Sequence, residues 1–183
     1  MLKRTHTLLL AVIALFLCTG GAAAQNMKTV QKDGFCFTYD ADRVKPEVSS
    51  GLVVVNIAFR SIDDNDNCLA GYSFMPSEME PLSELADSFF ESLRGTSSEK
   101  LTDISLGATE SATVLGEQGY AQTGTATVKG TGEKVKITFK ICNYKGKFTF
   151  IIEKMPIDDS LQPDAEIAKA FADIEASLVY SAQ

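Results

Sequence analysis

The sequence lacks tryptophan, and its one histidine, His6, lies among the first 24 residues. Those residues are typical of an export signal, so we expect a mature chain without histidine. Without histidine, Ser-His and Cys-His catalysis in their usual forms is excluded, and the commonest zinc and copper ligand is missing. The sequence also lacks an apolar run long enough to cross a bilayer of about 30 Å as a helix.

The N-terminal stretch has the three parts of a secretory signal. Lys3 and Arg4 form a basic start, residues 8–17 form a short apolar core, and Ala24 ends a run of small residues. A signal peptidase cleaves after such small residues. We therefore predict a signal peptide over residues 1–24 and export of the protein to the periplasm or out of the cell.

Cys18 offers an alternative within the same stretch. A cysteine that follows an apolar run is typical of lipid-anchored envelope proteins. Leu17, however, stands where lipoprotein processing prefers a small residue. Lipid attachment at Cys18 is therefore the minor alternative to cleavage after Ala24.

The chain that remains, residues 25–183, has the size of one ordinary domain. We expect a single domain without a further boundary. After removal of Lys3 and Arg4, 15 basic side chains face 24 acidic ones, a net charge of −9. Such an acidic protein repels nucleic acid and anionic lipid, so neither is expected as a partner.

Three cysteines, Cys36, Cys68 and Cys142, remain after the predicted cleavage. An odd number permits at most one internal disulfide in an oxidising compartment. We favour Cys36 with Cys68, because closing that loop of about 30 residues would add about 3 kcal/mol of stability. The alternative is that all three are small buried side chains.

The clearest structural pattern runs over residues 135–153. Val135, Ile137, Phe139 and Ile141 alternate with polar residues, which predicts a half-buried strand. Residues 143–146 supply turn chemistry, and the alternation then resumes in a second strand. The sequence thus predicts a hairpin at the centre of the fold.

Helical and further strand patterns surround this hairpin. A stripe of Leu82, Leu85, Phe89 and Leu93 predicts a helix that ends at Gly95. Ile167, Phe171, Ile174 and Leu178 form the stripe of a closing helix, for which residues 158–160 supply the N-terminal acceptors. Residues 25–34 are expected to be a polar lead-in and 40–51 a loop. The remaining predicted strands are 35–39, 52–61, 68–75, 101–106, 109–115 and 119–129.

Together these elements predict an α+β domain. Its mostly antiparallel sheet would have about six to seven strands, flanked by two main helices. The strand at 119–129 carries threonines on alternate positions, which predicts a polar, solvent-facing side.

Four segments are informative in their order along the chain: the opening strand FCFTYD (35–40), the helix LSELADSFFESL (82–93), Gly119-Tyr120 and the closing helix FADIEASL (171–178). They resemble the PsbP, Mog1 and DcrB group of α/β/α sandwiches. The resemblance implies an accessory that binds or assembles a larger partner and performs no chemistry of its own. DcrB-type members are envelope lipoproteins, which fits the predicted compartment. The resemblance transfers no site residue and implies no cofactor.

Asp63, Asn65 and Asn67 are the strongest candidates for metal ligands. Their alternate spacing resembles the start of an EF-hand loop. The glycine expected next is Cys68 and the bidentate glutamate is Phe74, so a true EF-hand is excluded. A looser calcium site is the alternative to a solvated turn, and Asp and Asn favour such turns.

Two weaker patterns suggest chemistry. Glu78, Glu80 and Glu84 could converge as an acid/base set, although acidic residues at a helix start usually answer the helix dipole. Cys142 follows Lys140, whose charge could lower the thiol pKa and make the cysteine redox-active. For the glutamates, interaction with the helix dipole is favoured. For Cys142, a half-buried or disulfide-bonded cysteine is favoured.

The sequence therefore predicts an exported envelope accessory without catalytic activity, cofactor or nucleic-acid partner. The partner would be an envelope protein, and the sequence leaves its identity and the oligomeric state open. The alternative is a protein that depends on a divalent cation or on a reactive thiol. A carboxylate-based hydrolase is the weaker alternative.

Overall fold

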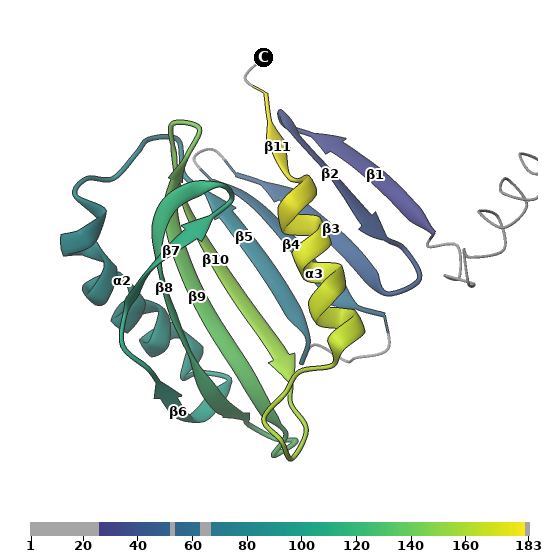
Figure 1. Cartoon of the computed structure of the whole chain (residues 1–183), viewed down its shortest axis with the longest axis vertical. Coiled ribbons are helices and arrows are strands. Elements are labelled where there is room, and N and C mark those ends of the chain that lie inside the picture. Colours follow the sequence, from purple (N-terminus) through teal and green to yellow (C-terminus); the bar gives the residue numbers. More distant parts are fainter. Residues whose placement is uncertain (1–25, 52–53, 63–66, 182–183) are drawn as a thin grey trace, which may run out of the picture.

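A computed structural model describes residues 26–51, 54–62 and 67–181. Its main feature is an antiparallel sheet in the strand order β3-β4-β5-β10-β9-β8-β6, with β7 also paired to β8 (Figure 1). The strands are β3 (Val44–Ser50), β4 (Val55–Ser61), β5 (Leu69–Phe74), β6 (Leu101–Leu106), β7 (Glu110–Val114), β8 (Glu117–Val128), β9 (Lys134–Tyr144) and β10 (Lys147–Pro156).

The predicted hairpin is the centre of this sheet. β9 and β10 are joined by Lys145 and Gly146, whose φ angles of 50° and 79° match the positive values of a type I′ turn. β9, however, is buried on both faces rather than half-buried. Thr138 is 8% exposed and Cys142 is 0% exposed. The prediction was wrong on this point because a layer of other elements covers the polar face as well.

One face of the sheet is covered by α2 (Leu82–Ser97), which lies over β8 and β9 (Figure 1). Its deepest row is Leu82, Ala86 and Phe90, while most of the predicted stripe lies beside that row and is half-buried. The helix also continues past Gly95, which is therefore not its C-terminal cap. The apolar periodicity identified the helix correctly. It did not identify the buried row, because the small side chain of Ala86 contributes little to an apolar pattern.

The opposite face is covered by a mixed layer of one helix and a small sheet (Figure 1). The helix is α3 (Ala165–Ser177), and the three-stranded sheet has the order β1-β2-β11. Its strands are β1 (Met27–Lys32), β2 (Phe35–Asp40) and β11 (Val179–Tyr180). Phe171 and Ile174 of α3 pack with Phe35 and Phe37 of β2 in one core, so helix and small sheet form a continuous cover.

α3 begins later than predicted. The Asp164 side chain accepts hydrogen bonds from the backbone N–H groups of Glu166 and Ile167, as an N-cap does. Asp158, the predicted first acceptor, instead accepts from the N–H groups of Ser160 and Gln162 and closes a separate turn. In both motifs an aspartate side chain accepts hydrogen bonds from backbone N–H groups that follow it. The sequence alone therefore did not show which aspartate begins the helix.

The α+β class and the mostly antiparallel sheet are confirmed, and the described residues contain more strands than predicted. β1 was predicted as a polar lead-in and β3 as a loop. Both are edge strands, and most of their side chains are exposed, so the apolar alternation that identifies a strand is weak there. β3 also contains Pro46, which is tolerated at a sheet edge.

The predicted Cys36–Cys68 disulfide is absent, although the structure describes both residues. Phe35 and Phe37 face the core, so Cys36 between them points to the other side of β2. Cys68 is inside the core, 2% exposed. The two cysteines therefore lie on opposite sides of the small sheet.

The predicted signal peptide and Cys18 lie outside the described residues, as do Asp63 and Asn65. The predicted cleavage, export and domain limits therefore stay predictions. Among the described residues, no helix is both long and apolar enough to cross a membrane.

Candidate functional site

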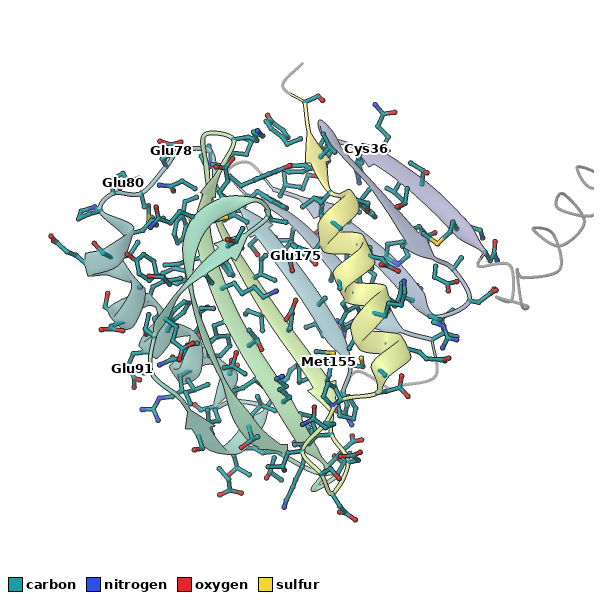
Figure 2. All side chains as sticks on the ribbon, viewed as in Figure 1. Cys36, Glu78, Glu80, Glu91, Met155 and Glu175 are labelled. Atoms are coloured by element: carbon teal, nitrogen blue, oxygen red, sulfur yellow. The ribbon has the colours of Figure 1, made fainter. Side chains whose placement is uncertain are left out.

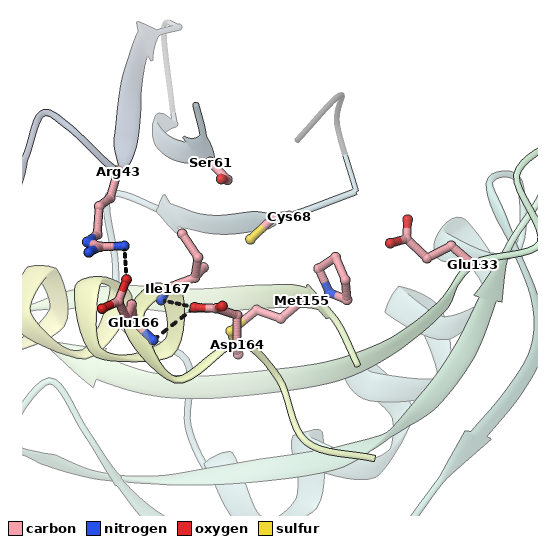
Figure 3. A pocket seen from close by; sticks show the side chains of 9 residues that line it. Arg43, Ser61, Cys68, Glu133, Met155, Asp164, Glu166 and Ile167 are labelled. Atoms are coloured by element: carbon pink, nitrogen blue, oxygen red, sulfur yellow. Dashed lines mark hydrogen bonds and ion pairs between the residues drawn. The ribbon is translucent and has the colours of Figure 1, made fainter. Parts of the chain in front are cut away.

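A cleft of about 530 Å³ opens where α3 begins, beside the ends of β4, β5 and β10 (Figure 3). It combines polar groups at the rim with sulfur-containing and aliphatic groups deeper in. Its lining residues are Arg43, Ser61, Cys68, Glu133, Met155, Pro156, Asp164, Glu166 and Ile167.

Arg43, in the turn between β2 and β3, forms one wall of the cleft and links the end of β2 to α3. Its guanidinium makes an ion pair with Glu166 in the first turn of α3 (Figure 3). The same guanidinium lies 3.7 Å from the carboxylate of Asp40, which is 7% exposed at the end of β2. A carboxylate that far from water needs such a partner, so Arg43 stabilises Asp40 and places Glu166.

Asp164 and Glu133 contribute the other acidic groups. Asp164 accepts hydrogen bonds of 2.9 and 3.0 Å from the N–H groups of Glu166 and Ile167. Glu133, at the far rim in Figure 3, accepts a hydrogen bond of 2.5 Å from the side-chain amide of Asn67. Hydrogen bonds from neighbouring backbone and side-chain groups thus hold both carboxylates in place.

Cys68, Met155 and Ile167 give the cleft an apolar interior. Cys68 and Met155 are buried members of the core, and Ile167 packs against that core from α3. The alternation of β10 turns Met155 toward the α3 side, since its cross-strand partner Lys136 shares that face. The cleft therefore presents a soft, polarizable floor beneath a charged rim.

The rim carries three carboxylates against one guanidinium. This excess of negative charge favours a cationic group, while the floor favours an apolar one. Within the described ranges, no three His, Cys, Asp or Glu side chains are close enough together to hold a metal ion. The hydrogen bonds and the ion pair hold these polar groups in fixed positions around the opening.

Neither a protein-family model nor a curated protein matches this chain. Its structure, however, is similar to the solution structure of cyanobacterial PsbP (CyanoP) from Synechocystis sp. PCC 6803. The TM-score is 0.53 and the sequence identity 14%, and the match covers 89% of this chain and 96% of the other. The chain has a PsbP-like fold. At this identity the likeness concerns the fold alone, and it confirms that part of the sequence resemblance.

Asn67 is the described member of the predicted metal set, and its amide nitrogen donates to Glu133. It therefore borders the cleft and fixes a rim carboxylate. The predicted cation site at Asp63 and Asn65 stays a prediction.

Glu78, Glu80 and Glu84 do gather, around a shallow hollow at the start of α2. Figure 2 shows Glu78 and Glu80 just before that helix. Glu80 accepts a hydrogen bond of 2.7 Å from Asn143, which also bonds the backbone N–H and carbonyl of Met79. Glu80 thus helps to fasten the segment before α2 to the end of β9, a structural role.

The structure contradicts the expected effect of Lys140 on Cys142. Burial raises the pKa of the Cys142 thiol to about 12, and the charges of Glu117 and Glu175 add to the rise. Lys140 does not offset this, because its ammonium is already bound to Glu153 at 2.9 Å and Glu175 at 2.7 Å. Cys142 is therefore a protonated core thiol at neutral pH, not an activated nucleophile.

Sequence reasoning missed this charged network on the α3 side of the sheet. Lys140, Glu153 and Glu175 are 19%, 11% and 19% exposed, and Glu175 lies between α3 and the sheet (Figure 2). Burial works to lower the pKa of Lys140, but the two carboxylates outweigh it and raise that pKa. Burial, Glu153 and Glu175 also raise the pKa of Tyr72 on β5. The sequence did contain one signal of this network, a lysine and a glutamate inside the two largely apolar strands β9 and β10.

Proposed function

We propose that this protein is an exported accessory that binds or assembles an envelope protein and performs no chemistry of its own. The PsbP-like fold, which extends over 89% of the chain, supports an accessory role. The partner surface would be the cleft at the start of α3. This cleft has polar groups at its rim and apolar groups at its floor. They come from β4, β10, α3 and the connections beside them.

The observation that carries this proposal is the pairing of an acidic rim with an apolar floor. Glu133, Asp164 and Glu166 surround the opening, and Met155 and Ile167 lie beneath it. A partner loop that places a lysine or arginine beside an apolar side chain would satisfy both parts. Such central anchors in desolvated pockets carry most of the energy of protein interfaces.

The polar groups of the rim are held in place by neighbouring residues. Arg43 is held by Glu166, the Asp164 carboxylate caps α3, and Glu133 accepts from Asn67. Groups arranged to satisfy each other give a rigid, preorganised surface, which lowers the entropic cost of binding a partner.

Charge reversal at the rim tests the proposal. Tagged Glu133→Lys protein and a matched Glu110→Lys control, in which the exposed β7 glutamate is reversed, would be used to capture partners from envelope extract. We expect one protein, identified by mass spectrometry, to bind the unaltered chain and the control at least tenfold better than Glu133→Lys. That protein should lose binding with rising salt, because an exposed charged rim is screened.

Melting temperatures of both variants show whether the fold is retained. Equal recovery of the same partners by the two charge reversals would overturn the assignment to this cleft. Recovery of none by the unaltered chain would overturn the binding role.

A further inference from the structure

Two sulfur-containing side chains lie at the floor of the cleft at the start of α3. Cys68, just before β5, and Met155, on β10, both line the cleft. They are 2% and 8% exposed, and both belong to the apolar core on this side of the sheet. The cleft therefore gives a small ligand access to two side chains that are otherwise packed in the core.

The strand register places these two side chains beside each other. The last pair of the β5–β10 ladder is Leu69 with Lys154, so the next position on each segment sets Cys68 opposite Met155. Side chains directly opposite in an antiparallel pair have Cβ atoms about 4.5–5.5 Å apart. In Figure 3 the Cys68 thiol points toward the Met155 side chain across the cleft. Methionine is unbranched and flexible, so its sulfur can adjust to a ligand that both residues share.

The chemistry of these two donors favours a soft metal ion. Thiolate and thioether sulfur prefer Cu(I), whereas Ca²⁺ prefers oxygen ligands. A zinc site usually has more than two protein ligands, whereas Cu(I) is stable with few. Cys68 and Met155 therefore suit Cu(I) better than they suit a divalent ion.

The charges around the cleft favour a cation at this floor. Glu133, Asp164 and Glu166 outnumber Arg43 at the rim, so the opening attracts positive ions. Cu(I) and the thiolate of Cys68 together form a neutral pair, which avoids an uncompensated charge beside the apolar core. The thiol proton passes to water as the sulfur–copper bond forms, and no electron is transferred.

We propose that Cys68 and Met155 bind one Cu(I) ion at the floor of the cleft, with the thiolate and the thioether as its ligands. The site goes beyond the proposed function, because the two sulfurs bind the ion without a protein partner. The other described thiols lie outside it. Cys36 points to the far side of β2, and Cys142 is 0% exposed within the core.

Competition for Cu(I) with the chelator bicinchoninate, under argon and with ascorbate, tests the site on the purified full chain. Cys18→Ser and Cys36→Ser form the background, so that neither thiol binds copper on its own. We expect the background protein to take one equivalent of Cu(I) from the chelator, and X-ray absorption to show sulfur as the neighbour of copper. Cys68→Ala in this background should lose the equivalent. A full equivalent in Cys68→Ala, or no copper taken up by the background protein, would overturn the proposal.

Met155→Leu separates metal binding from packing, because leucine is similar in size and has no sulfur. In the same background it should retain the fold and weaken Cu(I) binding by about tenfold or more. Met79→Leu, at a methionine that is 36% exposed and outside the cleft, is the matched control. It should bind Cu(I) as the background protein does.

Met155→Leu also decides the outcome if Cys68→Ala fails to fold. Equal Cu(I) affinity in Met155→Leu and Met79→Leu would overturn the two-sulfur site. The titration contains no envelope extract, so its failure would leave the proposed partner binding standing, and loss of partner capture would leave the copper site standing.

Discussion

The two faces of the eight-stranded sheet are held by different forces. On the α2 side, the rings of Phe90 and Phe139 stack with centroids 6.3 Å apart, and Phe89 meets Phe148 edge-on at 5.1 Å. On the α3 side, an apolar core surrounds Lys140, Glu153 and Glu175. The first face depends on buried apolar area, which hardly responds to pH. The second also depends on charges, which do.

The charged face is tolerable because its network lies at the edge of the α3 layer. Lys140 has two carboxylate partners, and each member keeps some contact with water. A fully dry ion pair often fails to repay the cost of removing its charges from water. Between α3 and the sheet this cost is smaller, because all three side chains keep some contact with water. The network also fixes where α3 docks.

The largest effect is expected on the α2 face. Phe90→Ala removes a fully buried ring and should lower the free energy of unfolding by about 3–5 kcal/mol. Phe89→Ala, one residue earlier and half-buried, is the matched control and should cost clearly less. Urea unfolding at pH 7 measures both. Equal losses would show that the face is not organised around the Leu82, Ala86 and Phe90 row.

The next largest effect is expected on the charged face. Lys140→Met leaves Glu153 and Glu175 close together without their cation, which should cost about 2–3 kcal/mol at pH 7. Adding Glu153→Gln and Glu175→Gln to the same chain should recover most of the loss, because no unpaired charge is then left. Failure of the triple variant to recover stability would mean that Lys140 contributes by packing rather than by charge.

Alkaline pH should weaken the α3 face selectively. The pKa of Cys142 rises from about 9 to about 12 on folding, so the folded chain keeps a proton that the unfolded chain releases in this window. Stability is therefore fully present below pH 9 and is lost above it, by about 1.4 kcal/mol per pH unit. Lys140, whose pKa is also raised, acts in the same direction at higher pH.

Cys142→Ala isolates this contribution. Its stability should fall by about 1 kcal/mol less than that of the unaltered chain between pH 9 and 10. Denaturant unfolding under reducing conditions at both pH values measures the difference. Parallel curves for the two proteins would assign the alkaline loss to other groups.

The smallest effect concerns the start of α3. Asp164→Ala removes the acceptor for two backbone N–H groups and should cost about 1 kcal/mol. Asp164→Asn keeps an acceptor oxygen and should retain most of the stability. Thermal unfolding separates the two variants. A loss as large in Asp164→Asn as in Asp164→Ala would contradict the capping role.

The sequence was most informative where one local pattern determines the outcome. The alternation in β9 and β10 and the Lys145-Gly146 turn specify the hairpin without reference to the rest of the chain. The buried row of α2 was harder to predict, since Ala86 is small and the half-buried Leu85 and Phe89 gave the stronger apolar pattern. β1 and β3 were missed because edge strands need no apolar face.

The cleft could not have been predicted from the sequence. Arg43, Glu133 and Asp164 are far apart along the chain, and each has the local environment of a loop or helix cap. Arg43 lies between β2 and β3, Glu133 between β8 and β9, and Asp164 between β10 and α3, and these three connections meet at one end of the sheet. The charged network was missed for a related reason, because Glu175 joins Lys140 and Glu153 only after α3 docks.

Site-specific photo-cross-linking in intact cells tests the central functional claim most directly. A photoreactive amino acid would replace Glu133 at the cleft rim or Glu110 on β7. We predict that position 133 cross-links one envelope protein through a segment that contains a basic residue beside an apolar one, and that position 110 does not. Cross-links that are absent at position 133, or identical at both positions, would contradict binding in the cleft.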